Sequence, residues 1–237
     1  PCYIAGGYYG EGKGIVELQK EMEEYLSWGL KNVKMKVGVL SMKEDAARVK
    51  AVRDVIGEDV RLMVDANCAY RSYEAIELSK RIAEYHPYWF EEPVMSDDYE
   101  GMFEFAAKSP IPLATGENEY TCYGFRDLID RSRPAILNPD AGSLGGITEF
   151  MKIAAYGHSK NIALSPHRQQ QTHILLDCAV PDVVMAEFYP PQYDTKIYHA
   201  SVHPIRFDAK TGMVSPNQAP GTGLDINRDV LQNFRVK

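Results

Sequence analysis

The stretch from residue 61 to residue 85, "RLMVDANCAYRSYEAIELSKRIAEY", contains one complete strand-and-helix unit. An apolar run ends in an acid at Asp65, and a polar loop follows. Apolar residues then recur at intervals of three and four from Ser72 to Tyr85, as on one face of a helix. This order is typical of a βα repeat, and the same order recurs on both sides of the stretch.

The repeated unit extends over most of the chain. The expected strands are Cys2 to Ala5, Val33 to Val37, Arg61 to Asp65, Trp89 to Glu91, Pro112 to Thr115, Ala135 to Leu137, Ile162 to Leu164 and Val184 to Glu187. The expected helices are Ile15 to Trp28, Lys43 to Ile56, Ser72 to Tyr85, Asp98 to Ala107, Tyr123 to Asp130, Ile147 to Tyr156 and Thr172 to Ala179. These elements predict an α/β protein with a (β/α)7β barrel of the TIM type. A doubly wound open sheet is less favoured, because no G-x-G-x-x-G motif follows the first strand.

The repeat stops after Ala200, where "FDAKTGMVSPNQAPGTGLD" indicates a hairpin and loop. We therefore predict a catalytic barrel over residues 1–204. Residues 205–237 are expected to form an extension that packs on the barrel or on a capping domain. Because Pro1 stands where an initiator Met would be expected, we interpret the chain as a fragment of a longer protein.

Composition limits the classes of function. Hydrophobic residues make up 45% and charged residues 25% of the 237 residues, which are globular values. The formal charge of -7 argues against a nucleic-acid partner. No apolar run is long enough to cross a membrane, so we expect no membrane partner. The four cysteines are scattered and are expected to be free thiols. We expect a cytoplasmic homo-oligomer that acts on a small molecule.

Acidic residues stand at the ends of three consecutive expected strands. Asp65, Glu91 and Glu117 are separated by 26 residues each, which is one βα unit. A single acid at a strand end is as often a helix cap or a surface charge, but three on adjacent strands favour a shared cation. Oxygen ligands of high charge suit Mg²⁺. We prefer Glu91 to Glu92 because Pro93 follows directly, although Glu91 continues the inward phase of its strand only weakly; Glu92 and Glu119 remain the alternative ligands.

Three further polar side chains follow the last three strands. Asp140 lies in "AILNPDAG", His167 in "ALSPHRQQQ" and Glu187 in "VVMAEF". A carboxylate on the neighbouring strand could hold an imidazole N–H and raise the basicity of His167. A lone histidine in a loop is more often structural, but the surrounding acids favour a catalytic role. The segment "HRQQQTH" lacks the H-E-x-x-H spacing of a zinc site.

The segment "NVKMKVG", residues 32–38, carries two lysines in an apolar strand. Alternation places Lys34 and Lys36 on one face and the apolar residues on the other. If that face were open to solvent the lysines would be ordinary; in a barrel they face the interior beside the acids. Two adjacent ammonium groups depress each other's pKa, so one of them could be a neutral base near physiological pH.

Taken together, "KMK", "VDAN", "WFEEP", "TGEN", "NPD" with "GGIT", and "SPH" resemble the enolase superfamily, in particular its mandelate racemase-like subgroup. The resemblance covers strands 2 to 8. It implies Mg²⁺ held by Asp65, Glu91 and Glu117, and a base motif at Lys34 and Lys36. It also implies a dyad of His167 and Asp140, with Glu187 hydrogen-bonding the substrate carboxylate. Members of the family carry an N-terminal capping domain, whereas the sequence of this chain begins at the first expected strand.

The resemblance implies removal of the proton α to a carboxylate, giving an enediolate. We expect dehydration of an acid sugar, with Asn67 and Tyr8 contacting the substrate. "YIAGGYYGEG" is loosely similar to dehydratases that act on tartrate. Racemisation or epimerisation of a 2-hydroxy acid is the alternative reaction, because the same two bases suit it. An inactive barrel fragment or binding scaffold is the alternative from another class.

Overall fold

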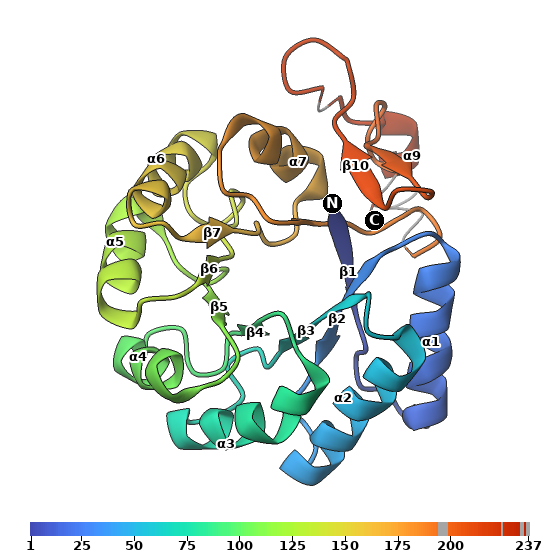
Figure 1. The fold of residues 1–237 in the computed structure, drawn as a ribbon. Coiled ribbons are helices and arrows are strands. Elements are labelled where there is room, and N and C mark those ends of the chain that lie inside the picture. Colours follow the sequence, from blue (N-terminus) through green and yellow to red (C-terminus); the bar gives the residue numbers. More distant parts are fainter. Residues whose placement is uncertain (194–198, 224, 233–234, 236–237) are drawn as a thin grey trace.

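The computed structural model describes residues 1–193, 199–223, 225–232 and 235. Eight parallel strands within these ranges form one curled sheet, seen end-on in Figure 1. Its strand order is β7-β6-β5-β4-β3-β2-β1-β8. The strands are β1 (Cys2–Gly6), β2 (Asn32–Lys36), β3 (Arg61–Asp65), β4 (Phe90–Glu91), β5 (Leu113–Thr115), β6 (Ile136–Leu137), β7 (Ala163–Leu164) and β8 (Ala186–Glu187).

The sheet closes into a barrel through the segment that leads into β8. Leu164 of β7 forms a parallel bridge with Val183, and the N–H of Val184 donates to the Leu164 carbonyl at 2.9 Å. Two residues further on, Ala186 of β8 pairs with Cys2 of β1. One short segment therefore joins both edges of the sheet, and the predicted α/β barrel is confirmed.

The helices alternate with the strands and surround them (Figure 1). They are α1 (Ile15–Ser27), α2 (Met42–Ile56), α3 (Ser72–Ile82) with the 3-10 turn η1 (Ala83–Tyr85), α4 (Tyr99–Lys108), α5 (Thr121–Ser132), α6 (Ile147–Ser159) and α7 (Gln170–Ala179). Local sequence sets their ends; at α2, the Ser41 hydroxyl accepts from the Glu44 N–H, and the Glu44 carboxylate accepts from the Ser41 N–H. None of the described helices has the length and apolar character that a bilayer crossing requires.

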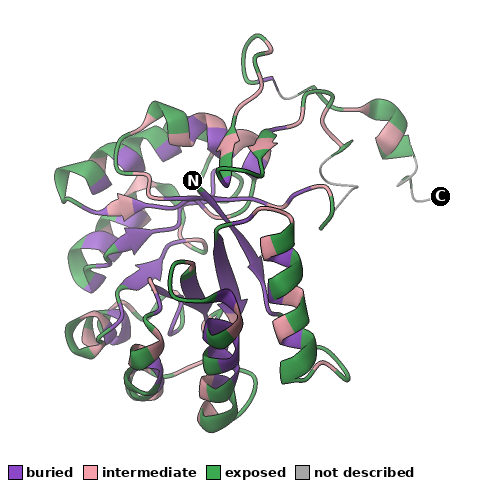
Figure 2. Ribbon diagram, turned by 45° about the vertical axis from the view of Figure 1, so that its right-hand side comes forward, coloured by how far each residue is buried: buried purple, intermediate pink, exposed green. Residues whose placement is uncertain are grey.

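Two apolar cores hold the barrel together. The larger lies between the sheet and the helices, which explains why the barrel strands are mostly buried while the helices expose their outer faces in Figure 2. The smaller fills the barrel interior and consists of Tyr3, Ala5, Met63, Trp89, Ala114, Ile136 and Met185. Within it the Tyr3 and Trp89 rings meet edge-to-face, with centroids 5.4 Å apart. This interior core forms the floor on which the polar strand ends stand.

The C-terminal segment contains the antiparallel hairpin of β9 (Arg206–Asp208) and β10 (Met213–Ser215), followed by α9 (Arg228–Gln232). The Cys2 N–H donates to the Gly212 carbonyl at 3.3 Å, and the Phe188 and Phe207 rings lie 5.2 Å apart. Gly29, at φ +96°, passes so close that a Cβ there would lie 2.4 Å from the Ala209 carbonyl oxygen. The hairpin thus packs on the barrel beside the start of β1, away from the strand ends that carry the acids. The division at residue 205 stays a prediction.

Candidate active site

Three carboxylates converge at the C-terminal ends of adjacent strands. Asp65 ends β3, Glu91 ends β4, and Glu117 follows β5 by two residues. One oxygen of each lies within 4.8 Å of the other two. Asp65 and Glu91 are register partners, and the Trp89 indole N–H donates to Glu91 Oε2 at 2.9 Å from the interior core. The expectation that Glu91 follows the inward phase only weakly was therefore wrong.

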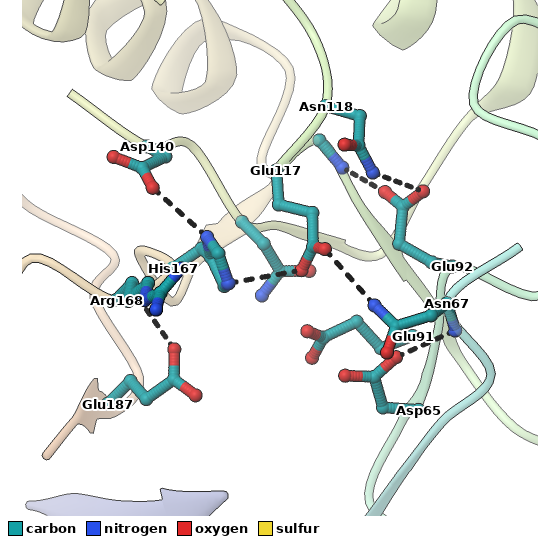
Figure 3. Close-up of polar contacts among 12 residues, drawn as sticks. Asp65, Asn67, Glu91, Glu92, Glu117, Asn118, Asp140, His167, Arg168 and Glu187 are labelled. Carbon is teal, nitrogen blue, oxygen red and sulfur yellow. Dashed lines mark hydrogen bonds and ion pairs between the residues drawn. The ribbon is translucent and has the colours of Figure 1, made fainter. Parts of the chain in front are cut away.

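The two alternative ligands lie outside this cluster. Glu92 has φ +43°, so its side chain leaves the inward phase and accepts hydrogen bonds from the Thr115 hydroxyl at 2.7 Å and the Gly116 N–H at 2.9 Å. Figure 3 shows it turned toward Asn118. Glu119 accepts a hydrogen bond from the Tyr99 hydroxyl. Glu92 therefore supports the loops that carry the cluster. Its position at a strand end does not by itself distinguish this role from that of a metal ligand.

The donor set of the cluster fits a divalent cation. Glu117 Oε2 is buried without a hydrogen-bond partner among the described residues; His167 Nε2, 3.5 Å away, makes an ion-pair contact but no hydrogen bond. Burial raises the pKa of Glu91 to about 8, and the Asp65 and Glu117 charges add to that rise against the opposing effect of Lys34. The three carboxylates repel one another, and a bound cation would relieve that repulsion. Oxygen ligands of this charge suit Mg²⁺.

Both lysines of β2 point into the barrel, as the alternation predicts. Lys34 is 1% exposed; its Nζ contacts Glu91 and lies 3.5 Å from Asp65 Oδ2 and 3.7 Å from Glu187 Oε1. Burial alone would lower the pKa of Lys34, but attraction to Glu187, Glu91, Tyr3 and Asp65 outweighs it and raises the pKa well above its usual range. The expected mutual depression of the lysine pKa values is therefore wrong for Lys34, which is a buried cation.

Lys36 lies nearer the mouth of the barrel. Its Nζ donates to Asp65 Oδ2 at 2.5 Å and also to Asn67 Oδ1. The Asn67 backbone N–H donates to Asp65 Oδ1 at 2.9 Å, and its side-chain amide donates to Glu117 Oε1 at 3.3 Å. The Tyr8 ring lies 5.7 Å from Lys36 Nζ and is 42% exposed. Both expected substrate contacts, Asn67 and Tyr8, thus lie beside the cluster, and their roles stay predictions.

The histidine and its carboxylate partner come from neighbouring loops after β6 and β7. His167 Nδ1 lies 3.1 Å from Asp140 Oδ2, and Figure 3 shows the ring between Asp140 and Glu117. Burial alone would lower the pKa of His167, but the hydrogen bond to Asp140 and the charges of Glu187 and Glu117 raise it. Between β2 and β7 lie β1 and β8 on one side and β3 to β6 on the other. Lys36 and His167 therefore approach the cluster from different sides of the barrel.

Glu187 is held at the rim by three partners. Its Oε2 accepts from the Arg168 N–H at 2.6 Å (Figure 3), its Oε1 accepts from the Tyr189 hydroxyl at 2.9 Å, and Lys34 Nζ lies 3.7 Å away. Burial would raise the pKa of Glu187, but attraction to Lys34 and His167 and the Arg168 N–H lower it. In this arrangement Glu187 is a counterion of Lys34, which is a role that the sequence did not indicate. Hydrogen bonding to a substrate carboxylate stays a prediction.

A cavity of about 670 Å³ opens above these groups, with Lys34, Lys36, Glu117, His167 and Glu187 in its wall. Its other lining residues are Ala5, Tyr8, Asn67, Arg168, Gln169, Gln170, Gln171, Tyr189 and Tyr193. The loop after His167 thus supplies much of one wall. We found no sequence signal for this contribution, because Arg168 and Gln169 adopt positive φ without being glycine. The volume suits a small organic molecule.

Comparison with known proteins identifies the family. Residues 17–230 match the family model described as enolase C-terminal domain-like. Arabinonate dehydratase of Saccharolobus solfataricus is 38% identical over the whole chain, which covers 64% of that protein. D-galactarolactone cycloisomerase of Agrobacterium fabrum is 34% identical over 91% of the chain, which covers 60% of that protein.

A solved structure gives the same result. A mandelate racemase/muconate lactonizing enzyme from a marine actinobacterium, crystallised with magnesium, superposes on the whole chain with a TM-score of 0.90 and 34% identity, and the chain covers 66% of it. The chain therefore spans a little under two thirds of the length of each of these relatives. These matches confirm the resemblance that the strand-end motifs indicated. The chain belongs to the enolase C-terminal domain-like family of the enolase superfamily.

Proposed function

We propose that this chain carries the catalytic centre for Mg²⁺-dependent removal of the proton α to a carboxylate, followed by dehydration of an acid sugar. The observation that carries the proposal is the convergence of Asp65, Glu91 and Glu117 between Lys36 and His167. The similarity to arabinonate dehydratase supports the substrate class. A cytoplasmic location and a homo-oligomer, together with the lack of nucleic-acid and membrane partners, stay predictions.

Asp65, Glu91 and Glu117 would hold the cation. When bound, Mg²⁺ would neutralise negative charge beside the substrate and stabilise the charge that develops on its carboxylate. The structural relative that was crystallised with magnesium supports this choice of metal. Lys34 would remain a fixed positive charge beneath the cluster, since its Nζ is surrounded by carboxylates and is almost wholly buried.

Proton transfer requires one group that removes the α-proton and one that protonates the leaving β-hydroxyl. Lys36 and His167 line the cavity and approach it from different sides, so each could serve one face of the substrate. Asp140 accepts the hydrogen bond of His167 Nδ1, which leaves Nε2 directed toward the cluster. The imidazole is thereby oriented for proton exchange at a fixed atom.

Racemisation or epimerisation of a 2-hydroxy acid is the second candidate. The placement of Lys36 and His167 on different sides favours it, because inversion requires proton return to the opposite face. A racemase from Streptomyces coelicolor with bound magnesium has a TM-score of 0.90 to the chain and 28% identity. Dehydration differs by releasing water and forming a 2-keto acid.

The test is incubation of the protein, in its full natural length and with Mg²⁺, with a panel of acid sugars. Dehydration gives a 2-keto product that reacts with semicarbazide, whereas racemisation gives no keto product but forms the stereoisomer inverted at the α-carbon, with exchange of the α-proton in deuterated solvent. Removal of Mg²⁺ by a chelator should abolish both signals. An inactive scaffold would show neither signal in the presence of Mg²⁺.

A pair of matched variants tests the assignment of the site. Glu117→Gln removes a cluster carboxylate, whereas Glu119→Gln changes a carboxylate two residues away that contacts Tyr99. We expect only the first to lose activity and Mg²⁺ binding. Equal activities of the two variants would refute the proposed metal centre.

A further inference from the structure

A second histidine connects the two loops that carry the dyad. His173 lies in the first turn of α7, is 2% exposed, and is six residues beyond His167. Its Nε2 accepts a hydrogen bond from the Ala141 N–H at 2.9 Å, and its Nδ1 lies 2.8 Å from the Arg168 carbonyl oxygen. Ala141 follows Asp140 directly, and Arg168 follows His167 directly. One buried ring therefore joins the two residues that directly follow the members of the dyad.

The two contacts determine the protonation of the ring. A backbone N–H can only donate, so Nε2 must be the acceptor and carries no proton. The carbonyl of Arg168 can only accept, so the single ring proton lies on Nδ1. A protonated imidazolium would direct a second N–H at the Ala141 N–H and break that contact. Burial lowers the pKa of His173, which agrees with the neutral ring.

Packing fixes the orientation of this ring. It stacks on Phe150 of α6, with centroids 5.9 Å apart and an interplanar angle of 25°. Arg168, whose carbonyl contacts the ring, has φ +58°, a backbone conformation that L residues seldom adopt without support. The N–H of the same residue donates to Glu187 Oε2 at 2.6 Å. The ring thus supports a strained turn that also fixes Glu187.

We infer that His173 is a positioning residue that sets the distance and orientation of His167 relative to Asp140. The role rests on the proposed function only in so far as His167 transfers a proton. His173 does not line the cavity formed by the described residues, and its Nε2 lies 4.0 Å from Asp140 Oδ1, too far for a hydrogen bond. It therefore acts through the two peptide groups and not on the substrate. Neither its spacing of six residues from His167 nor its place on the buried face of α7 indicated this role.

The experiment compares two substitutions in the full-length protein with Mg²⁺. His173→Phe keeps a ring for stacking on Phe150 but removes both hydrogen bonds. His173→Gln offers an amide oxygen for the Ala141 N–H and an amide N–H for the Arg168 carbonyl. His158→Gln, at a histidine of α6 whose side chain is 60% exposed, is the matched control.

We expect His173→Phe to lower α-proton exchange of the configuration that His167 serves by about tenfold to a hundredfold. We expect less than about threefold change in KM and in the exchange rate of the configuration that Lys36 serves. His173→Gln should recover most of the lost exchange, and His158→Gln should behave as the parent. Unchanged exchange, an equal loss for both configurations, or no recovery in His173→Gln would each overturn the inference.

A spectroscopic measurement separates this inference from the proposed function. Nitrogen-15 NMR of the imidazoles should show His173 protonated at Nδ1 only, and should show the His167 Nδ1–H that Asp140 accepts. His173→Phe should lose or shift the His167 signal, and His173→Gln should restore it. If no acid sugar exchanges its proton, the proposed function fails while this signal still decides the inference: a His167 signal identical in all variants overturns it. If His173→Phe does not fold, His173→Asn, whose amide is too short to join both peptide groups, replaces it.

Discussion

Replacement of Glu92 tests whether this residue supports the acidic cluster without belonging to it. The side chain is fully buried, and its Oε1 accepts from the Thr115 hydroxyl at 2.7 Å and the Gly116 N–H at 2.9 Å. Its Oε2 accepts longer contacts from Asn118 Nδ2 at 3.4 Å and Cys68 Sγ at 3.1 Å. Gly116 directly precedes Glu117, so these bonds fix the loop that carries a cluster carboxylate.

The two short bonds set the expected magnitude. A hydrogen bond to a charged group contributes about 1.5 to 3 kcal/mol, and a buried donor left without a partner is destabilising. Glu92→Leu should therefore lower the free energy of unfolding by about 3 to 6 kcal/mol. Glu92→Gln keeps a carbonyl oxygen for both donors and should cost about 1 to 2 kcal/mol. Because native domains are stable by about 5 to 15 kcal/mol, the leucine variant should be folded only marginally.

Urea denaturation followed by circular dichroism measures the stability, and calorimetric titration measures Mg²⁺ binding. We expect Glu92→Gln to bind Mg²⁺ within about fivefold of the parent affinity, because it retains the main loop contacts. Glu91→Gln should instead lose Mg²⁺ binding, because it removes a ligand, and Glu119→Gln should change neither quantity. If Glu92→Gln lost Mg²⁺ binding at unchanged stability, Glu92 would be a ligand and the assigned cluster would be wrong.

Four further outcomes are expected. Asp65→Asn and Glu117→Gln should each weaken Mg²⁺ binding about tenfold or more in calorimetry, because each removes one converging anion; an unchanged affinity would exclude that ligand. Mg²⁺ affinity should rise about tenfold per pH unit up to about pH 8, because the cation must displace the proton of Glu91, whose pKa is raised to about 8; a pH-independent affinity would contradict this. Lys34→Met should destabilise the metal-free protein by about 3 to 5 kcal/mol at pH 8 in urea denaturation and by less at pH 5, where the unpaired carboxylates can take up protons; an equal loss at both values would refute the ion pairing. Burial raises the pKa of Asp177 to about 8, so the folded protein binds this proton more tightly than the unfolded chain does, and the contribution of Asp177 to stability should decline from about pH 4 to pH 8; the parent should lose stability relative to Asp177→Asn over this range in the same assay, and parallel pH profiles would contradict this.

The barrel could be predicted because the same pattern, an apolar run followed by an amphipathic helix, recurs along the chain. Each observed strand and helix of the barrel lies within three residues of its predicted bounds. The length of the last strand could not be predicted. Val184 belongs to the same apolar run as Glu187, but it pairs with β7 while Ala186 pairs with β1. A change of partner within one strand depends on closure of the sheet, and hydrophobic periodicity carries no information about it.

Residues of the candidate site could be predicted only where a chemically reactive side chain stands at the end of a predicted strand. Asp65 and Glu117 each follow an apolar run, so the repeat alone brought them together. The supporting role of Glu92 and of His173 rests on hydrogen bonds to backbone groups, which any residue type supplies. The charge state of Lys34 depends partly on Glu187, which lies 3.7 Å away but comes from a strand that is distant in the sequence.

The charges inside the barrel explain why a lysine can be buried beside a metal centre. Four negative charges come from Asp65, Glu91, Glu117 and Glu187 when they are ionised, and two positive charges come from Lys34 and Lys36. These six groups therefore have a net charge of -2, which is a deficit of two positive charges. A divalent cation removes that deficit, and a metal-free site can do so only by retaining protons, as the raised pKa of Glu91 indicates. A carboxylate substrate then adds one negative charge to a neutral interior. His167, whose pKa is raised, is the remaining group of the site that can balance it by taking up a proton. Under the proposed function, binding of a carboxylate substrate should therefore be accompanied by proton uptake at His167, whereas a neutral sugar should bind without proton uptake.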